Sequence, residues 1–358
     1  MSAPELYHTW FRKIRKLWPT ERVTRLRNLT WMLVGMYQSR SVHLQEMAAK
    51  LPLEVRLTSI ARRFRRFLNN PAFAPRAWYA PLARSLLEQA AATGAVRLIL
   101  DSTKVGAGHQ LLMVALAYHK RALPIAWTWV KRPQGHSTVR QQLSLLRYVH
   151  TLVPVQARVQ VVGDGEFGHV PVARQLDRWD WLYVLRQKGD VQVCVSHTVF
   201  HWDPLASLVT QRDHLIWHPG ALFTLRHLFR AHLLGYWAAG ETDPWLLMTN
   251  FPAPRQALRA YRRRMWVEEM FGDWKGHGVE IETTHLRQAD RLSRLVFVAA
   301  LLYLWLVSHG SQAIKAGLRA WVDRQSRRDL SVFRIGLYVS DRLCALGRKL
   351  QIRLIPYF

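Results

Sequence analysis

Apolar and polar residues alternate with a helical period over the first ninety positions. Apolar side chains recur three and four residues apart in two segments, 44–51 and 57–68, which is the spacing of a single buried stripe on an α-helix. Pro52 lies between the segments and lacks the backbone N–H that a helix interior uses. The pattern predicts two short helices joined by a turn, and Pro71 and Pro75 mark the predicted end of this helical region.

The period changes after residue 95. Four short apolar runs have the length of buried strands, and one amphipathic helical stretch follows the third run. The strand segments are 96–100, 111–118, 123–130 and 158–162, and the helical segment is 138–152. The order strand, strand, strand, helix, strand is that of an RNase H-like α/β core. Asp101 ends the first run and Asp164 follows the fourth after one glycine, so two acids at strand ends give the first indication of chemistry.

A second strand-rich segment follows. Residues 182–250 contain strand-like runs separated by Gly, Pro and Asp, which predicts a β-rich insertion. Beyond residue 288 the pattern is helical again. The longest apolar run, 295–307, has 13 residues, fewer than the roughly 18 to 20 that cross a bilayer. It is interpreted as a core helix, and no membrane partner is expected.

The net charge of the chain indicates the kind of partner it binds. The 358 residues include 51 Lys and Arg against 24 Asp and Glu, a formal charge of +27, which predicts a polyanionic partner. Residues 1–90 hold 16 Lys and Arg against 5 acids. On the predicted helix 57–68, Arg62, Arg63 and Arg66 surround a narrow apolar stripe, as in a helix-turn-helix unit that binds DNA. A solvated basic helix without groove contacts is the alternative.

Cysteine usage and the N-terminus indicate the compartment. Cys194 and Cys344 are the only cysteines and lie 150 residues apart, which argues against a disulfide framework and against a cysteine-built zinc site. The basic N-terminal residues contain no apolar run of the kind found in secretory signals. A cytoplasmic protein is therefore expected.

A site for two divalent metals about 3.5 to 4 Å apart needs a third carboxylate besides Asp101 and Asp164. Four residues of the segment YRRRMWVEEMFGDWKG would share one face of an α-helix, because offsets of 0, 3, 7 and 14 fall within roughly 60° at about 100° per residue. They are Tyr261, Arg264, Glu268 and Lys275. Glu269 points about 100° away, so Glu268 is the candidate ligand. A surface helix with ordinary i,i+4 ion pairs is the alternative.

This segment resembles the signature of DDE transposases of the insertion-sequence-4 type. In that family Tyr, Arg, Glu and Lys are separated by two, three and six residues, and the segment from Tyr261 to Lys275 fits each spacing. The resemblance extends to the Asp101-Ser102-Thr103 stretch, to HKRALPIAW after it, and to Asp164-Gly-Glu-Phe-Gly, which is similar to the second-aspartate motif of the family. Gly165 stands where the family often has arginine, and Met265 where tryptophan is common.

The resemblance implies a cut-and-paste DNA transposase of a bacterial insertion sequence. Asp101, Asp164 and Glu268 would be the catalytic acids and would hold two Mg²⁺ ions, for which Mn²⁺ can substitute. The signature residues Tyr261 and Arg264, together with Lys275, would contact DNA. Strand cleavage would proceed through a hairpin, after which the freed end is joined to target DNA.

The resemblance also implies the partners. These are double-stranded DNA, as terminal inverted repeats and as target, and a second protomer in a synaptic complex associated with the nucleoid. In the family a tryptophan of the insertion can stack on a base flipped out of the hairpin. The candidates here are Trp202, Trp217, Trp237 and Trp245, although each is more often a core residue.

The predicted fold class is α/β, an RNase H-like core with a β-rich insertion between the second Asp and the Glu and with helical N-terminal and C-terminal regions. The predicted domains are a basic DNA-binding region at 1–90, the first part of the core at 91–181, the insertion at 182–250, the second part of the core with the Glu helix at 251–287, and a basic helical region at 288–358. Two functional alternatives stay open, namely an RNase H-like nuclease without strand transfer and a non-catalytic DNA-binding protein derived from a transposase.

Overall fold

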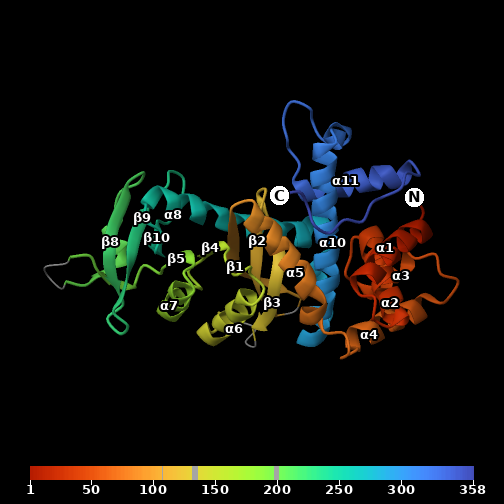
Figure 1. The fold of residues 1–358 in the computed structure, drawn as a ribbon, viewed down its shortest axis with the longest axis horizontal. Coiled ribbons are helices and arrows are strands. Elements are labelled where there is room, and N and C mark those ends of the chain that lie inside the picture. The colour runs from red at the N-terminus through yellow and green to blue at the C-terminus, as the bar shows by residue number, and fades with distance from the viewer. Residues whose placement is uncertain (107, 131–135, 197–200) are drawn as a thin grey trace.

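The computed structural model describes residues 1–106, 108–130, 136–196 and 201–358. The molecule is elongated, with the N-terminal helices at one end, the main sheet in the middle and a group of antiparallel strands at the other end (Figure 1). The long helix α10 (Ala289–Lys315) separates the N-terminal helices from the sheet. The mixed α/β fold class predicted from the sequence is confirmed.

Five strands form the RNase H-like core. They are β1 (Ala95–Val105), β2 (His109–Tyr118), β3 (Arg121–Val130), β4 (Arg158–Gly163) and β5 (Leu182–Arg186). Their spatial order is β3-β2-β1-β4-β5. The first three strands are antiparallel neighbours, whereas β4 is parallel to both β1 and β5. This arrangement places the carboxyl ends of β1 and β4 at the same edge of the sheet.

Strand β1 is longer than the apolar run predicted. It continues through Asp101 to Val105, because β2 pairs with it residue by residue as far as His109. Asp101 therefore lies within the strand and not at its end. The turn between β2 and β3 consists of His119 and Lys120, which both have positive φ (43° and 63°), as in the two-residue turns that suit the twist of a hairpin.

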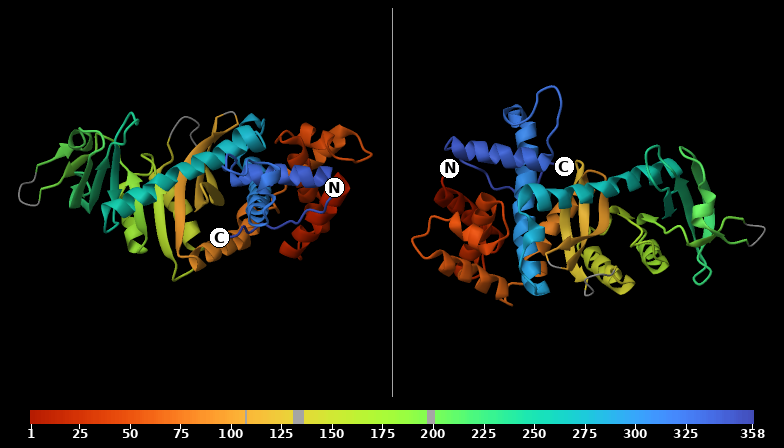
Figure 2. Two further views of the ribbon diagram at one scale, coloured as in Figure 1. Left: turned by 90° about the horizontal axis from the view of Figure 1, so that it is seen from above. Right: turned by 180° about the vertical axis from the view of Figure 1, so that it is seen from behind.

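Helices cover both faces of this sheet (Figure 2). The helices α6 (Val139–His150) and α7 (Val170–Arg178) contact each other and lie on one face. On the other face run α8 (Pro254–Tyr261) and α9 (Met265–Gly272). Helix α5 (Pro75–Ala92) packs against β1, β3 and α10.

The strands of the predicted insertion extend the same sheet. They are β6 (Gln192–Cys194), β7 (Asp203–Pro204), β8 (Leu215–Phe223), β9 (Phe229–Tyr236) and β10 (Trp245–Thr249), and β10 pairs antiparallel with β5 to give the order β5-β10-β9-β8-β6-β7. Strand β5 lies inside the segment 182–250, yet it is the fifth strand of the core. The additional strands therefore begin after Arg186.

Helix α10 is the central apolar element of the C-terminal half. It is the one helix among the described residues that is long and apolar enough to cross a membrane, and 94% of its most apolar window is buried inside the protein. The prediction of a core helix at 295–307 is thus confirmed. Helix α11 (Val332–Ala345) crosses it closely, because a Cβ atom on Gly336 would lie 1.9 Å from the Leu306 carbonyl oxygen.

The N-terminal region is helical as predicted. It contains α1 (Ala3–Leu17), α2 (Val23–Ser39), α3 (Leu44–Ala49) and α4 (Leu57–Asn69). Helix α4 buries Ile60, Phe64 and Leu68 against its neighbours, whereas the opposite face is exposed. Short 3₁₀ turns at Leu205–Leu208 (η1), Ile281–Thr283 (η4) and Leu318–Trp321 (η5) complete the irregular connections.

Candidate active site

Two parallel strands bring Asp101 and Asp164 together. In the register of β1 and β4, Leu100 is the partner of Gly163, so the next residue on each chain is one of the two acids. Adjacent strands are about 4.8 Å apart, and both residues come from the same edge of the sheet. Asp101 is buried, with 6% of its surface exposed, and Asp164 is half-buried.

The two acids share an unfavourable electrostatic environment. Burial and then the charge of Asp164 raise the pKa of Asp101 to about 7. Burial also raises the pKa of Asp164, although the Glu166 backbone N–H and the Arg264 guanidinium act in the opposite direction. Crowded carboxyl groups of this kind favour either a shared proton or a bound cation.

Arg264 connects the third acid to this pair. Its Nη1 atom lies 2.7 Å from Oε1 of Glu268 and 3.8 Å from Oδ2 of Asp101. The Glu268 charge is a minor contributor to the raised pKa of Asp101, after burial and Asp164. Glu269 instead pairs with Arg121 of β3 at 2.9 Å. The structure therefore places Glu268, and not Glu269, on the side of α9 that faces Asp101.

The Arg264 guanidinium is the positive charge that lies between Asp101 and Glu268. Within the described parts of the chain, no group of three or more His, Cys, Asp or Glu side chains is arranged closely enough to hold a metal. The donor set nevertheless suits a hard cation, since it consists of carboxylate oxygens around a buried acid whose charge is only partly compensated.

The predicted single helical face is wrong in detail. The helix that carries the signature is interrupted by a 3₁₀ turn at Arg262–Arg264 (η2) and by a π-helical turn at Asp273–Gly278 (η3). A 3₁₀ turn advances by about 120° per residue, and a π turn winds more loosely than an α-helix. The uniform 100° rotation assumed for Tyr261 and Lys275 therefore does not hold.

Tyr261 and Lys275 have different surroundings. Tyr261 is buried, its ring packs edge-on against Trp245 at 5.1 Å between centroids, and burial raises its pKa while Arg264 and Arg186 oppose the rise. Lys275 forms an ion pair with Glu282. Of the signature residues, Arg264 therefore joins Glu268 to Asp101, Tyr261 lies beside Arg264, and Lys275 pairs elsewhere.

An open cleft of about 550 Å³ borders Asp164, Arg264 and Glu268. Its other walls include Arg186, the last residue of the core strand β5, and Lys188 just beyond it. Sequence analysis missed these two cations, although two basic residues at the end of a predicted strand are a recognisable signal. The cleft thus combines carboxylates with cations, which suits a phosphodiester lying next to a metal site.

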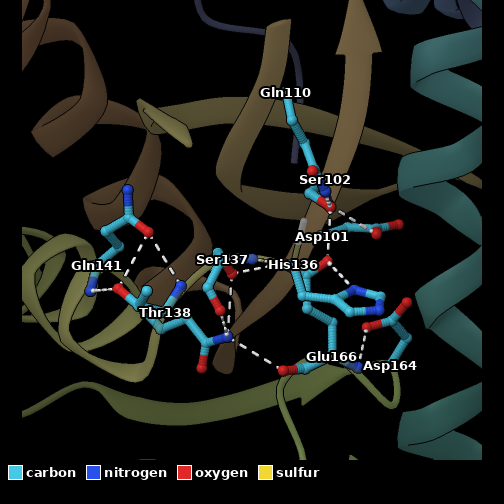
Figure 3. A network of polar contacts seen from close by, with 10 residues as sticks. Asp101, Ser102, Gln110, His136, Ser137, Thr138, Gln141, Asp164 and Glu166 are labelled. Carbon is cyan, nitrogen blue, oxygen red and sulfur yellow. Dashed lines mark hydrogen bonds and ion pairs between the residues drawn. The ribbon is translucent and has the colours of Figure 1, made fainter. Parts of the chain in front are cut away.

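Sequence analysis also missed Glu166, the acid two residues after Asp164. Its side chain is 6% exposed and forms hydrogen bonds with Ser102 and Ser137 (Figure 3). The motif Asp164-Gly-Glu-Phe-Gly contained this residue, but the pattern gave no reason to distinguish a buried, hydrogen-bonded acid from an ordinary turn residue.

The remaining predicted residues lie on α4 and in or beside the additional strands. Arg62, Arg63 and Arg66 are exposed on α4, at the end of the molecule opposite to β8 and β9 (Figure 1). The four tryptophans named as base-stacking candidates are all half-buried in or beside the additional strands. Trp245 is the one that contacts Tyr261.

Fold and site together define a class. A β3-β2-β1-β4-β5 sheet with an acid on β1, an acid after β4 and a third acid on a later helix is the arrangement of an RNase H-like protein with an Asp, Asp, Glu acidic triad. A family model described as "Transposase DDE domain" matches residues 93–305, more than half of the chain. The chain therefore belongs to the DDE transposase family.

No curated protein matches the chain. Among solved structures, the chain is similar to a piggyBac transposase in a synaptic complex with hairpin DNA, determined by cryo-EM. The TM-score is 0.46 and the sequence identity is 10%, over 94% of this chain and 77% of that chain.

Proposed function

We propose that the chain is the transposase of a bacterial insertion sequence of the insertion-sequence-4 type, which excises and inserts DNA by a metal-dependent cut-and-paste reaction. One observation carries this proposal. In a member of the DDE transposase family, Asp101 on β1 lies beside Asp164, the residue that follows β4, and Arg264 pairs with both Asp101 and Glu268.

Asp101, Asp164 and Glu268 are the residues that would hold two Mg²⁺ ions, or Mn²⁺ in their place. When bound, the ions supply an activated water or DNA 3′-hydroxyl and stabilise the charge on the leaving oxygen. The burial that raises the pKa of Asp101 to about 7 supports this assignment, because perturbed acids in a cleft cluster at functional sites.

The cations of the cleft act on the substrate. Arg264 is positioned to hold a phosphate next to the acids, and Arg186 and Lys188 extend the cationic wall along the cleft. Guanidinium groups suit this task because they donate two parallel hydrogen bonds to phosphate oxygens. Tyr261 supports Arg264 from the buried side. Lys275 would reach DNA only after it leaves Glu282.

The wider assembly follows from the resemblance to the insertion-sequence-4 type. Two protomers would pair the two terminal inverted repeats in a synaptic complex, and each end would pass through a hairpin before it joins target DNA. The exposed arginines Arg62, Arg63 and Arg66 on α4 support a DNA-binding role for the N-terminal region. The protein would work in the bacterial cytoplasm, in association with the nucleoid.

The test is cleavage of DNA that carries the terminal repeats flanking the coding region. We expect Mg²⁺-dependent cleavage and joining by the wild-type protein. Asp101→Asn, Asp164→Asn and Glu268→Gln should each lose more activity than the about 10- to 100-fold typical of residues behind the metal ligands, with DNA binding retained. Glu269→Gln is the matched control and should stay near wild type, because Glu269 pairs with Arg121.

Two results would contradict the proposal. Loss of cleavage in Glu269→Gln together with full activity in Glu268→Gln would show that the other acid of the pair is the ligand. Hydrolysis of the repeats without any joined product would identify a nuclease without strand transfer.

A further inference from the structure

Glu166 is an extensively hydrogen-bonded acid beside the site. Its Oε1 atom accepts hydrogen bonds from the backbone N–H and the hydroxyl of Ser137 at 2.5 Å each. Its Oε2 atom accepts the Ser102 hydroxyl at 2.8 Å. The Glu166 carbonyl accepts the side-chain amide of Gln142 at 3.0 Å. Figure 3 shows that these bonds tie together three separate segments of the core.

A continuous path through Glu166 joins the first two acids of the triad. At one end, the Glu166 backbone N–H donates to Oδ1 of Asp164 at 2.9 Å. The Glu166 side chain then reaches across to Ser102 on β1. At the other end, the Ser102 backbone N–H donates to Oδ1 of Asp101 at 2.8 Å. Each acid is thus fixed by one backbone donor, and the two donors are connected by one side-chain hydrogen bond.

We propose that Glu166 is a positioning residue, a clamp that sets the separation and orientation of the Asp101 and Asp164 carboxylates through Ser102. The inference rests on the proposed function, because it gives a purpose to holding two mutually repelling acids side by side. Without the clamp, no side-chain hydrogen bond would connect the backbone donors of Asp101 and Asp164. Residues behind metal ligands orient them in this way.

Glu166 is unsuited to the role of a further metal ligand. Both of its oxygens already accept hydrogen bonds from serine donors, and its side chain is almost fully buried. It is also more than a space-filling side chain. Ser102 Oγ accepts a hydrogen bond from Gln110 Nε2 at 2.7 Å, so its own proton must go to Glu166. An acceptor at this position receives the hydrogen bond that Ser102 donates.

The direction of the Ser102–Glu166 hydrogen bond can be tested by substitution. A Glu166→Gln side chain keeps the volume and can still accept from Ser137, but the amide NH₂ in place of Oε2 cannot accept the Ser102 hydroxyl proton, so the hydrogen bond that Ser102 donates is lost. The clamp therefore predicts that Glu166→Gln behaves like Ser102→Ala. A space-filling role predicts that it behaves like wild type. Gln141→Ala is the matched control, because Gln141 caps the start of α6 with Thr138 and bonds to neither acid.

Two measurements on the full chain test whether Glu166 positions Asp101 and Asp164. The first is Mn²⁺ binding, followed by electron paramagnetic resonance without DNA. Affinity should fall about 10- to 100-fold in Glu166→Gln and Ser102→Ala, and the double variant should be no weaker than Glu166→Gln alone. The second is hydrogen exchange, which should accelerate in peptides covering 98–104 and 162–168 but not in α11, at 332–345.

Wild-type Mn²⁺ affinity and unchanged exchange in Glu166→Gln would overturn the clamp. So would a loss in Gln141→Ala as large as in Glu166→Gln, since that result would show a general effect of loosening α6. If Asp101→Asn, made as a single substitution, does not weaken Mn²⁺ binding, the proposed metal site is wrong. Hydrogen exchange of the peptides 98–104 and 162–168 then remains as the test of whether Glu166 positions the two acids. In the transposition assay the clamp variants should lose turnover and keep DNA affinity.

Discussion

Asp273 holds the helix that carries Glu268 against the core sheet. Its side chain is 1% exposed, and its Oδ2 atom accepts a hydrogen bond from Arg121 Nε at 2.7 Å and one from the Tyr303 hydroxyl at 3.5 Å. Arg121 lies on β3 and pairs with Glu269 as well. Replacing Asp273 by Asn keeps the shape of the protonated acid and removes its charge.

The direction of the effect follows from the pKa. Burial raises the pKa of Asp273 from 3.8 to about 6, although Arg121 acts in the opposite direction. A raised pKa in the folded protein means that the contribution of Asp273 to stability is fully present below pH 3.8 and is lost as the pH rises through about 6. A shift of roughly two units corresponds to about 3 kcal/mol. Between pH 4 and pH 7.5 the loss is roughly 2–3 kcal/mol, because the unfolded acid is already partly ionised at pH 4.

Urea unfolding followed by tryptophan fluorescence measures this difference. We compare the free energy of unfolding of Asp273→Asn with that of the wild type at each pH. The difference, variant minus wild type, should rise by about 2–3 kcal/mol between pH 4 and pH 7.5, since the contributions of other titrating groups cancel. Glu269→Gln is the control, because it removes an exposed partner of the same arginine and should change stability by no more than about 1 kcal/mol. A difference that is independent of pH, or that favours the wild type as the pH rises, would refute the reasoning by showing that the Arg121 ion pair outweighs burial.

Two further predictions concern the C-terminal packing and the N-terminal surface. Gly336→Ala should destabilise the protein by about 1–3 kcal/mol or more in thermal or urea unfolding, because the new Cβ would lie 1.9 Å from the Leu306 carbonyl oxygen. Gly272→Ala is the control and should be neutral or stabilising, because the space around its Cβ is open. Replacing Arg62, Arg63 and Arg66 together by Ala should lower the slope of log K against log salt for binding terminal-repeat DNA by up to about 3, because each phosphate that an arginine neutralises adds about 0.9 to that slope; an unchanged slope would show that this face of α4 does not touch DNA.

Local pattern was sufficient to predict the core strands. The runs that became β2, β3 and β4 are continuous in apolar residues, since both faces of the sheet are covered by helices. Pattern could not predict where β1 ends. Its last residues, 102–105, are held in the strand by pairing with β2, which is a non-local interaction that no short window of sequence contains.

Asp101 and Asp164 were predicted from their places after apolar runs and Glu268 from its helical spacing, but two supporting residues were not predicted. Arg121 and Glu166 are ordinary in sequence, one in a basic turn and one in an acidic motif, and their importance appears only when β3 meets α9 and when Ser102 meets Glu166. Lys275, in contrast, was predicted to lie beside Glu268 but pairs with Glu282. A uniform helical rotation placed it beside Glu268, whereas it lies in a π turn, a departure from α-helical winding that the spacing of residues does not reveal.

Asp101 and Asp273 are both buried acids, but Asp273 pairs with Arg121 at 2.7 Å, whereas Asp101 lies beside a second acid. A buried acid beside a second acid is unfavourable, and the pKa of Asp101 near 7 expresses that cost. Elsewhere the chain buries apolar side chains in one continuous core that runs from the N-terminal helices through the sheet to α10. Such a core tolerates a strained polar centre to the extent that the charge and the hydrogen-bonding groups of that centre are compensated. Asp101 accepts one backbone hydrogen bond, has the Arg264 guanidinium at 3.8 Å, and precedes Ser102, whose hydroxyl donates to Glu166. This partial compensation helps the polar centre to persist within an apolar core.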